Sequence, residues 1–348
     1  MKSAASPVTE FTKGESSPDP SSDLSRIVAL VDEEMRLVED WLKTNLIDDN
    51  PFVEQLLKQI FSAGGKRIRP LIVLLSSRAT AGEGELSRLH IILGVLTELI
   101  HTASLVHDDV IDKASVRRGQ ETINKTWNDR LAVLMGDLLF AQASICLARI
   151  MNPVIVGIYG QVLGDLCAGE IKQMRMQFST DIDWESYTSK SVSKTASLIS
   201  AGSHSGAILN GCDNDTIQAL KDYGINLGIC FQIVDDLLDI TASQKETGKA
   251  AGSDLKNGVI TAPSLFVLEK GGEKADRLRK LIRERTVTTD EGVAEALDLI
   301  VSSGGVEATV ELAAGYTARA RACLEVLPDT PYREALGELA DYVMIRTR

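Results

Sequence analysis

The sequence has few cysteines, and their arrangement excludes the commonest cysteine-based sites. Five cysteines occur in 348 residues, at positions 146, 167, 212, 230 and 323, and no two of them form a Cys-x-x-Cys pair. An odd and scattered set indicates a reducing compartment rather than a disulfide-stabilised secreted protein. The spacing also excludes the usual zinc motifs.

Strand signals and aromatic residues are scarce as well. Aromatics make up 5% of the chain, and the Asn-Gly pairs at 210–211 and 257–258 are not flanked by alternating apolar and polar residues. Apolar residues instead recur every three or four positions between residues 27 and 60, and breaks fall at Gly or Pro, as at 152–153, 271–272 and 304–305. This pattern predicts an all-α fold.

The chain has fewer basic than acidic residues. The chain has 37 Lys and Arg against 49 Asp and Glu, which gives a net charge of −12. An acidic protein repels a phosphate backbone, so the composition argues against a nucleic-acid-binding protein.

The first 22 residues differ from the remainder. They contain three prolines and many serines without apolar periodicity, so we expect residues 1–22 to be disordered and residues 23–348 to form one helical domain. This segment has neither the apolar region of a secretion signal nor the Arg-rich character of a transit peptide. We therefore expect the protein in the cytoplasm or the plastid stroma and not outside the cell.

No segment reads as a membrane span. The most apolar candidate, residues 131–150, is interrupted by Asp137 and Gln142 and carries Arg149 near its end. We interpret it as a helix of the protein core.

The feature that stands out is Asp-Asp-x-x-Asp, which occurs twice, at residues 108–112 (the first acidic motif) and 235–239 (the second acidic motif). On a helix, residues i and i+4 share a face, so the first and last aspartates of each motif can aim two carboxylates into a space about 6 Å tall. Oxygen ligands in such a space suit a hard divalent cation such as Mg²⁺, which completes its shell with water and phosphate oxygens.

One isolated acidic cluster is more often a solvated helix face. Two copies in apolar surroundings favour a site, because residues 96–106 and 227–234, which precede them, are mostly apolar. Burying carboxylates there without partners would cost several kcal/mol per charge, so cations or basic ligands are implied.

Two short basic clusters accompany the acidic motifs. Residues 64–70 read Gly-Gly-Lys-Arg-Ile-Arg-Pro, and residues 117–119 read Arg-Arg-Gly directly after the first acidic motif. Either cluster alone would more often serve surface solubility. Beside the aspartates, the mixture of Arg forks and Lys charges is suited to gripping a diphosphate.

Taken in order, these motifs resemble the trans-prenyltransferases, or all-trans polyprenyl diphosphate synthases. The resemblance spans roughly residues 24 to 348 and is closest to the long-chain solanesyl diphosphate synthases of cyanobacteria and plastids. It rests on seven stretches, namely residues 64–70, 101–109, 117–119, 169–173, 194–198, 231–236 and 248–249.

The resemblance implies a single bundle of ten or more helices around a deep central cavity, with the acidic motifs facing each other, and a homodimer. It also implies the reaction: Mg²⁺ and cationic side chains draw the diphosphate from an allylic primer, and isopentenyl diphosphate attacks the resulting carbocation.

Residue roles follow from the same resemblance. The Mg²⁺ ligands would be Asp108, Asp112 and Asp235, with Asp109 and Asp239 as supporting or water-mediated ligands. The allylic diphosphate and the cation would be held by Lys194, Thr195, Gln232, Lys249 and Arg117. The isopentenyl diphosphate site would contain Lys66, Arg69, His101 and Arg118.

Several of these positions have ordinary structural interpretations. His101 lies seven residues before Asp108 on the same helix face, but a lone histidine there is more often a satisfied core residue. Thr195 and Gln232 could bond locally to backbone. Val259 stands where shorter-chain relatives often have a lysine, and Lys256 could substitute for that contact.

Small residues near the first acidic motif favour a long product. Ala103 and Ser104 lie about one turn before Asp108, where enzymes making short products often carry an aromatic residue. We therefore expect C45 solanesyl diphosphate for a quinone side chain. A product this apolar could leave through peripheral contact with a membrane.

Three alternatives remain open. A geranylgeranyl diphosphate synthase would share every motif and stop at C20. A terpene cyclase would usually lack the second Asp-Asp-x-x-Asp and the Gly-Gly-Lys-x-x-Arg segment, both of which are present. A non-catalytic regulatory subunit of a heteromeric prenyltransferase would typically have lost motif members, and none of those named above is lost.

Overall fold

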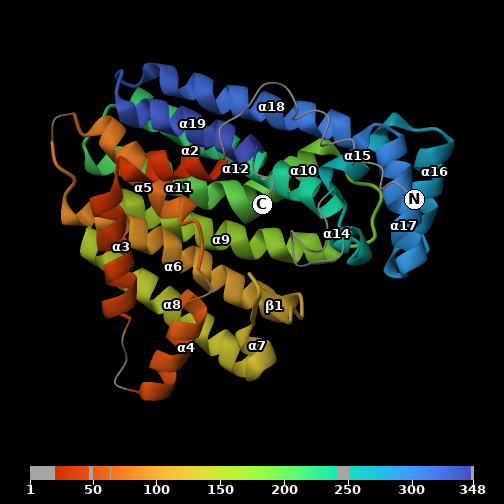
Figure 1. Cartoon of the computed structure of the whole chain (residues 1–348), viewed down its shortest axis with the longest axis horizontal. Coiled ribbons are helices and arrows are strands. Elements are labelled where there is room, and N and C mark those ends of the chain that lie inside the picture. The colour runs from red at the N-terminus through yellow and green to blue at the C-terminus, as the bar shows by residue number, and fades with distance from the viewer. Residues whose placement is uncertain (1–19, 47–49, 63, 83, 242–250, 346–348) are drawn as a thin grey trace.

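Helices form almost the whole described chain, and the two strands span two residues each (Figure 1). The structure is a computed structural model, and it describes residues 20–46, 50–62, 64–82, 84–241 and 251–345. The all-α expectation is confirmed. Pro20 already belongs to the first described helix, so the helical part starts inside the segment expected to be disordered.

The elements follow one another along the chain. The first half contains α2 (Pro20–Ala29), α3 (Asp32–Thr44), α4 (Pro51–Ser62), α5 (Ile68–Thr80), α6 (Arg88–Ile111), β1 (Val116–Arg117), β2 (Gln120–Glu121), α7 (Ile123–Thr126), α8 (Asp129–Ile150) and α9 (Pro153–Met176). The second half contains α10 (Trp184–Ser191), η1 (Val192–Ala196), α11 (Ser197–Leu209), α12 (Asn214–Thr241), α14 (Ser253–Lys256), α15 (Ala262–Lys270), α16 (Glu273–Arg283), η2 (Thr286–Thr288), α17 (Asp290–Ser302), α18 (Gly305–Cys323), η3 (Leu324–Val326) and α19 (Pro331–Ile345).

Side-chain caps start the long helices that carry the site. The Ser87 hydroxyl accepts a hydrogen bond from the Leu89 N–H at the start of α6, and the Asn128 side chain caps α8 in the same way. At α9, the Asn152 cap precedes Pro153, whose fixed φ suits the first helical position. These bonds satisfy N–H groups that have no partner within the helix.

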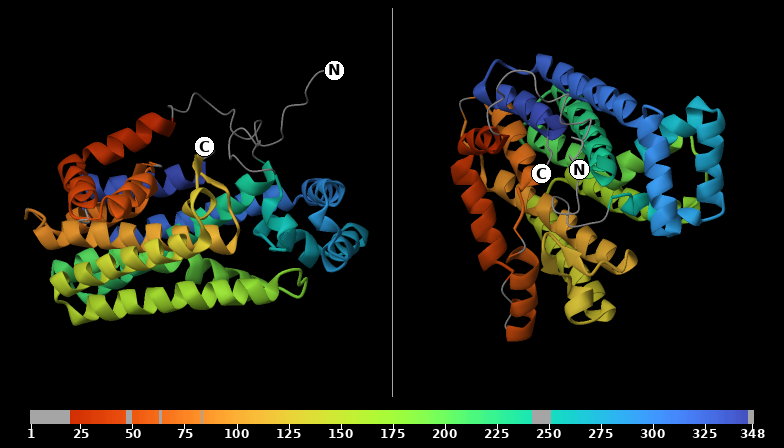
Figure 2. Two further views of the ribbon diagram at one scale, coloured as in Figure 1. Left: turned by 90° about the horizontal axis from the view of Figure 1, so that it is seen from below. Right: turned by 45° about the vertical axis from the view of Figure 1, so that its right-hand side comes forward.

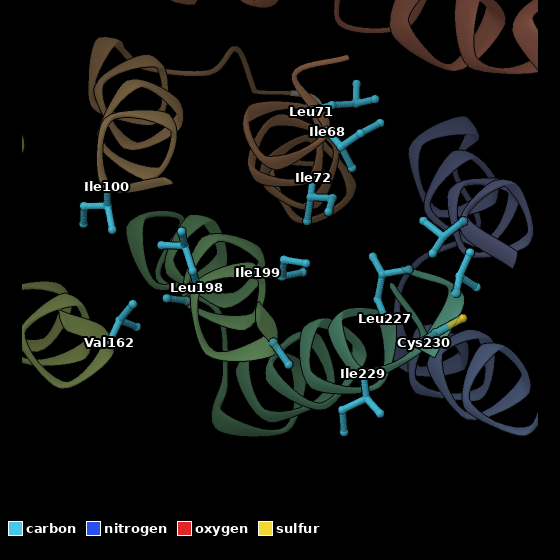
Figure 3. Close-up of a cluster of buried hydrophobic side chains, with 14 of the residues drawn as sticks. Ile68, Leu71, Ile72, Ile100, Val162, Leu198, Ile199, Leu227, Ile229 and Cys230 are labelled. Carbon is cyan, nitrogen blue, oxygen red and sulfur yellow. The ribbon is translucent and has the colours of Figure 1, made fainter. Parts of the chain in front are cut away.

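Helix α11 lies at the centre of the bundle, where residues 197–207 are all buried. Small side chains allow this. A Cβ on Gly224 of α12 would lie 2.4 Å from the Ser200 Cα, so the two helices pack almost backbone to backbone. Around them, apolar side chains of α5, α6, α9 and α12 point into one core, including Ile72, Ile100 and Val162 (Figure 3).

Helices α8 and α9 form the outer layer on one side of the bundle, whereas α18 and α19 cover another side (Figure 2). By length and composition, three helices could cross a membrane: α6, α8 and α9. Their most apolar windows are 78%, 33% and 22% buried, respectively. The expectation that residues 131–150 form a core helix holds for one face only, because Leu139 and Cys146 are buried in the core whereas Leu134 and Ile145 are exposed.

All five cysteines are free.

Candidate active site

The first acidic motif lies at the C-terminal end of α6. Asp108 is half-buried, and its backbone carbonyl accepts a hydrogen bond from the Asp112 N–H at 2.8 Å. Burial raises the pKa of Asp108 to about 6, and the charges of Glu170 and Asp112 act in the same direction, against Lys194 and Arg117. A carboxylate that is costly to keep charged in this half-buried position would be stabilised by a bound cation.

Asp109, by contrast, points into the protein. Its Oδ1 accepts hydrogen bonds from both Nε and Nη2 of Arg117, each at 2.8 Å. Arg117 belongs to β1, so this ion pair holds the β1–β2 hairpin against the end of α6 (Figure 1). Asp109 thus stabilises the first acidic motif from the protein interior, and the guanidinium of Arg117 is occupied by this ion pair.

The second acidic motif lies near the end of α12 and is built in the same way. Its middle carboxylate, Asp236, is 1% exposed and accepts hydrogen bonds from the Tyr187 hydroxyl at 2.7 Å, Gln232 Nε2 at 2.9 Å and the Ala262 N–H at 3.0 Å. It anchors α12 to α10 and α15. Asp235 and Asp239, at i and i+4, share a different face of α12.

The short π-helix η1 packs against α9 and α12. Lys194 Nζ donates to Glu170 Oε2 at 3.1 Å, and the Thr195 hydroxyl donates to Gln232 Oε1 at 2.9 Å. Burial lowers the pKa of Lys194, but Glu170 and Asp108 outweigh it and raise that pKa overall. A charged lysine therefore stands beside the first acidic motif, and Thr195 reaches the turn before the second.

Two glycines let η1 sit this close to its neighbours. A Cβ on Gly169 of α9 would lie 2.8 Å from the Ser193 Cβ, and one on Gly228 of α12 would lie 2.3 Å from the Ala196 Cα. Single π-turns are often found at functional sites. Glu170 follows Gly169 in a motif noted in the sequence but received no role there; the structure places it against Lys194.

The two basic clusters lie close to each other. Arg118 Nη1 donates to the Gly64 carbonyl, and a Cβ on Gly65 would lie 2.5 Å from that nitrogen. Lys66 Nζ donates to the Tyr342 hydroxyl of α19 at 2.6 Å. The diglycine therefore lets Arg118 approach the loop that carries Lys66.

His101 is neutral and belongs to this basic group. Its Nε2 lies 3.0 Å from Arg69 Nη1, and because an arginine can only donate, Nε2 accepts and the ring proton is on Nδ1. Burial, followed by the charges of Arg69 and Arg118, lowers the pKa of His101 well below its ordinary value. The imidazole can thus accept from Arg69 and donate through Nδ1.

A cavity of about 60 Å³ lies beside these groups. Its lining includes Arg67, Glu98, His101, Arg117 and Arg118. The concentration of guanidinium groups suits a phosphate or diphosphate.

The sequence also suggested two other lysines as diphosphate contacts. Lys249 lies outside the described residues. Lys256, which could have replaced a diphosphate contact, instead donates to the exposed Asp290 at 2.7 Å. That ion pair joins α14 to α17, so the structure does not place Lys256 at the site.

The donor groups fit Mg²⁺ only in part without a substrate. Among the residues that the structure describes, no group of three or more His, Cys, Asp or Glu side chains gathers closely enough to hold a metal. Asp108 and Asp112 provide oxygens on one helix end, and burial raises the pKa of Asp108, so a cation beside it would favour its charged form. Diphosphate oxygens and water would complete such a shell.

Comparison with known proteins identifies the family. The polyprenyl synthetase family model matches residues 50–300. The chain belongs to the polyprenyl synthetase family. It is accordingly a trans-prenyltransferase, as the paired acidic motifs and the basic clusters indicate.

Individual members of the family resemble the whole chain. A prenyl transferase of Synechocystis sp. is 45% identical over 92% of this chain and 98% of its own length. Solanesyl-diphosphate synthase 2, chloroplastic, of Oryza sativa is 40% identical over 93% of this chain and 80% of its own. The crystal structure of polyprenyl synthase from Caulobacter crescentus, complexed with calcium and isoprenyl diphosphate, matches with a TM-score of 0.88 and 32% identity, over 96% of this chain and all of that one.

Proposed function

We propose that this protein is a long-chain all-trans polyprenyl diphosphate synthase that adds isopentenyl diphosphate repeatedly to an allylic diphosphate primer, up to C45 solanesyl diphosphate for a quinone side chain. One observation carries the proposal. Helix α6 bears an acidic pair at its end, Asp108 and Asp112, while His101 and Glu98 on the same helix line a cavity rich in arginine. Helix α6 thereby borders an acidic region, which would bind a diphosphate through Mg²⁺, and a basic region, which would bind a diphosphate directly. The resemblance to the rice solanesyl-diphosphate synthase supports the C45 product.

The acidic side would hold the allylic diphosphate. Asp108, Asp112 and Asp235 would be the Mg²⁺ ligands, with Asp109 and Asp239 in support. When bound, Mg²⁺ supplies positive charge that stabilises the departing diphosphate. The calcium ion in the Caulobacter crescentus complex supports a divalent cation in this family.

Three side chains of η1 and α12 would act on the same substrate. The Lys194 ammonium, kept charged by Glu170, would contact the diphosphate as negative charge develops on it. Thr195 and Gln232 are bonded to each other, and their oxygen dipoles would stabilise the carbocation. Lys249 would hold the allylic diphosphate with Lys194.

The basic side would hold isopentenyl diphosphate. Lys66, Arg69 and Arg118 would bind its diphosphate, and neutral His101 would donate a hydrogen bond through Nδ1. Because the two diphosphates bind on different parts of α6, the double bond of one substrate can approach the allylic carbon of the other.

Product analysis tests the proposal directly. Purified protein is incubated with Mg²⁺, isopentenyl diphosphate and geranylgeranyl diphosphate, and the dephosphorylated products are weighed by mass spectrometry. We expect a main product of C45. With farnesyl diphosphate as the primer in a parallel reaction, a product that stops at C20 would indicate a geranylgeranyl diphosphate synthase, whereas no consumption of isopentenyl diphosphate with either primer would indicate a regulatory subunit.

We further propose that the outward faces of α8 and α9 form a homodimer interface. Val133, Leu134 and Ile145 are exposed on α8, and Gly160 and Gly164 of α9 have open space where a Cβ would be. Exposed apolar side chains gathered on neighbouring helices favour an interface, and small residues let a second helix approach closely.

Replacing Leu134 with aspartate should shift the protein from dimer to monomer, because a charge would enter an apolar interface. Leu134 is 62% exposed, so the monomer itself should fold normally. Light scattering during gel filtration gives the mass. Val326→Asp, at another exposed apolar position, is the matched control and should remain dimeric. A wild type that elutes as a monomer would refute the interface.

The proposed compartment of this protein rests on its relatives. The rice relative is chloroplastic by name. We propose the cytoplasm or the plastid stroma for this chain, with peripheral contact to a membrane as the route for product release.

A further inference from the structure

Arg67 lies within the Gly-Gly-Lys-Arg-Ile-Arg segment, yet the proposed reaction gives it no role. Its guanidinium is shared between two carboxylates from different helices. Nε donates to Glu39 Oε1 of α3 at 2.6 Å, and Nη1 donates to Glu98 Oε1 of α6 at 2.7 Å. Its side chain is 10% exposed, which makes this pairing much stronger than a surface ion pair.

The backbone of Arg67 is unusual. It has φ 48 in the left-handed region, immediately before α5, and its carbonyl accepts the Leu71 N–H. Non-glycine residues rarely adopt this conformation without compensating contacts. The two carboxylates provide them. Because Lys66 and Arg69 flank this turn, the anchoring of Arg67 sets where both side chains start.

Glu98 is the buried carboxylate among these cations. It is 3% exposed and lines the same cavity of about 60 Å³ as Arg118 and His101. Burial lowers the pKa of Arg118, and the charge of Glu98 opposes that change, so the carboxylate and the guanidinium interact electrostatically. A buried carboxylate without a partner is strongly unfavourable. Glu98 must therefore be paired with one arginine or another.

We propose that Arg67 is a positioning residue that occupies Glu98 and thereby leaves Arg118 available to a diphosphate. The inference rests on the proposed binding of isopentenyl diphosphate at this cavity. Without Arg67, Glu98 recruits Arg118, and the site loses a diphosphate donor to an internal ion pair. Arg67 thus acts on substrate binding without touching the substrate.

The test measures binding of inorganic pyrophosphate by calorimetry in the absence of Mg²⁺, and in parallel the KM for isopentenyl diphosphate and kcat. Arg67→Gln should weaken pyrophosphate binding about tenfold or more and raise KM similarly, with kcat and the KM of the allylic primer nearly unchanged. Glu98→Gln alone measures how far the loss of this carboxylate from the cavity changes affinity by itself, and recovery in the double variant is judged against that value. The double variant Arg67→Gln/Glu98→Gln should recover most of the affinity, because no charge remains to capture Arg118.

Recovery of pyrophosphate affinity in the double variant is the decisive outcome. If Arg67 bound the diphosphate directly, the double variant would stay as weak as Arg67→Gln, and the inference would be overturned. Unchanged binding in Arg67→Gln would overturn it as well. Should Arg67→Gln fold poorly, Arg67→Lys keeps the charge but loses the fork, and should show a smaller loss that Glu98→Gln again reverses.

Controls separate this inference from the proposed function. Arg277→Gln removes an exposed arginine of α16 that pairs with Glu295, and should change nothing. Pyrophosphate binding does not depend on turnover. A wild type that binds pyrophosphate but makes no long product would contradict the proposed function and leave the role of Arg67 to be judged by rescue.

Discussion

Replacing Asp108 with asparagine should lower kcat by roughly a thousandfold, which is typical for the loss of a group that stabilises developing charge. The amide keeps the shape of the side chain but removes one charge from the acidic pair that we assign to Mg²⁺. Asp108 is also the carboxylate whose pKa is raised to about 6 by burial and by Glu170 and Asp112. Initial rates over a range of Mg²⁺ concentrations measure the effect, and added Mg²⁺ should restore little of it.

The same substitution should stabilise the metal-free protein. Because folding raises the pKa of this carboxyl, the folded state holds the proton more tightly than the unfolded state, and stability falls as pH rises from about 4 to about 6. Asparagine removes that penalty. Above pH 6, with EDTA present, we expect a gain of about 2 kcal/mol after allowance for solvent screening, or roughly 3 °C in Tm. The gain should disappear toward pH 4.

Two results would contradict this account of Asp108. Full activity in Asp108→Asn would exclude it as a metal ligand. A clear loss of stability would mean that the charge of Asp108 stabilises the fold through its attraction to Lys194. Asp215→Asn, an exposed carboxylate in the first turn of α12, is the matched control and should change neither kcat nor Tm.

Replacing Ala103 with phenylalanine should shorten the product from C45 to C20–C25. Ala103 is fully buried and lies five residues, or about 7–8 Å along the helix axis, before Asp108. A growing chain that starts at the metal ligands and enters the bundle would meet the added ring early. Mass spectrometry of the dephosphorylated products gives the length, and the rate of the first condensation should change little.

The alternative for Ala103 has a different signature. If the side chain packs in a closed core, phenylalanine would overpack it and cost about 1–3 kcal/mol of stability, while the product would stay at C45. Ser104, which lies closer to the face of Asp108, would then be the next position to enlarge. Ala314→Phe introduces the same ring on the exposed face of α18 and should leave length and Tm unchanged.

Sequence patterns predicted the helical fold and singled out the two acidic motifs because both depend on local features. The period of the apolar residues depends on one helix at a time, and each aspartate pair needs only the spacing i, i+4. The anchoring roles of Asp109 and Asp236 were less accessible. They depend on Arg117 and Tyr187, which reach these carboxylates from other elements.

Other features could not be found from one sequence. The ion pair of Arg67 with Glu98 joins positions 31 residues apart, and nothing local marks that distance as a contact. The exposed face of α8 could not be told from its buried face, because apolar composition alone does not show which side chains the fold covers. The π-turn of η1 was equally hidden, since it follows from the glycines that face it on α9 and α12.

The π-turn also determines how the protein tolerates changes in length. In η1 the Ser197 N–H bonds to the Val192 carbonyl, which accommodates one residue more than an α-helical turn would. Deleting a single residue there would restore regular geometry and rotate Lys194 by about 100° relative to α11. The lysine would then leave the acidic pair although every side chain of the site were retained. Insertions and deletions in this short segment should therefore be far more damaging than most point substitutions around it.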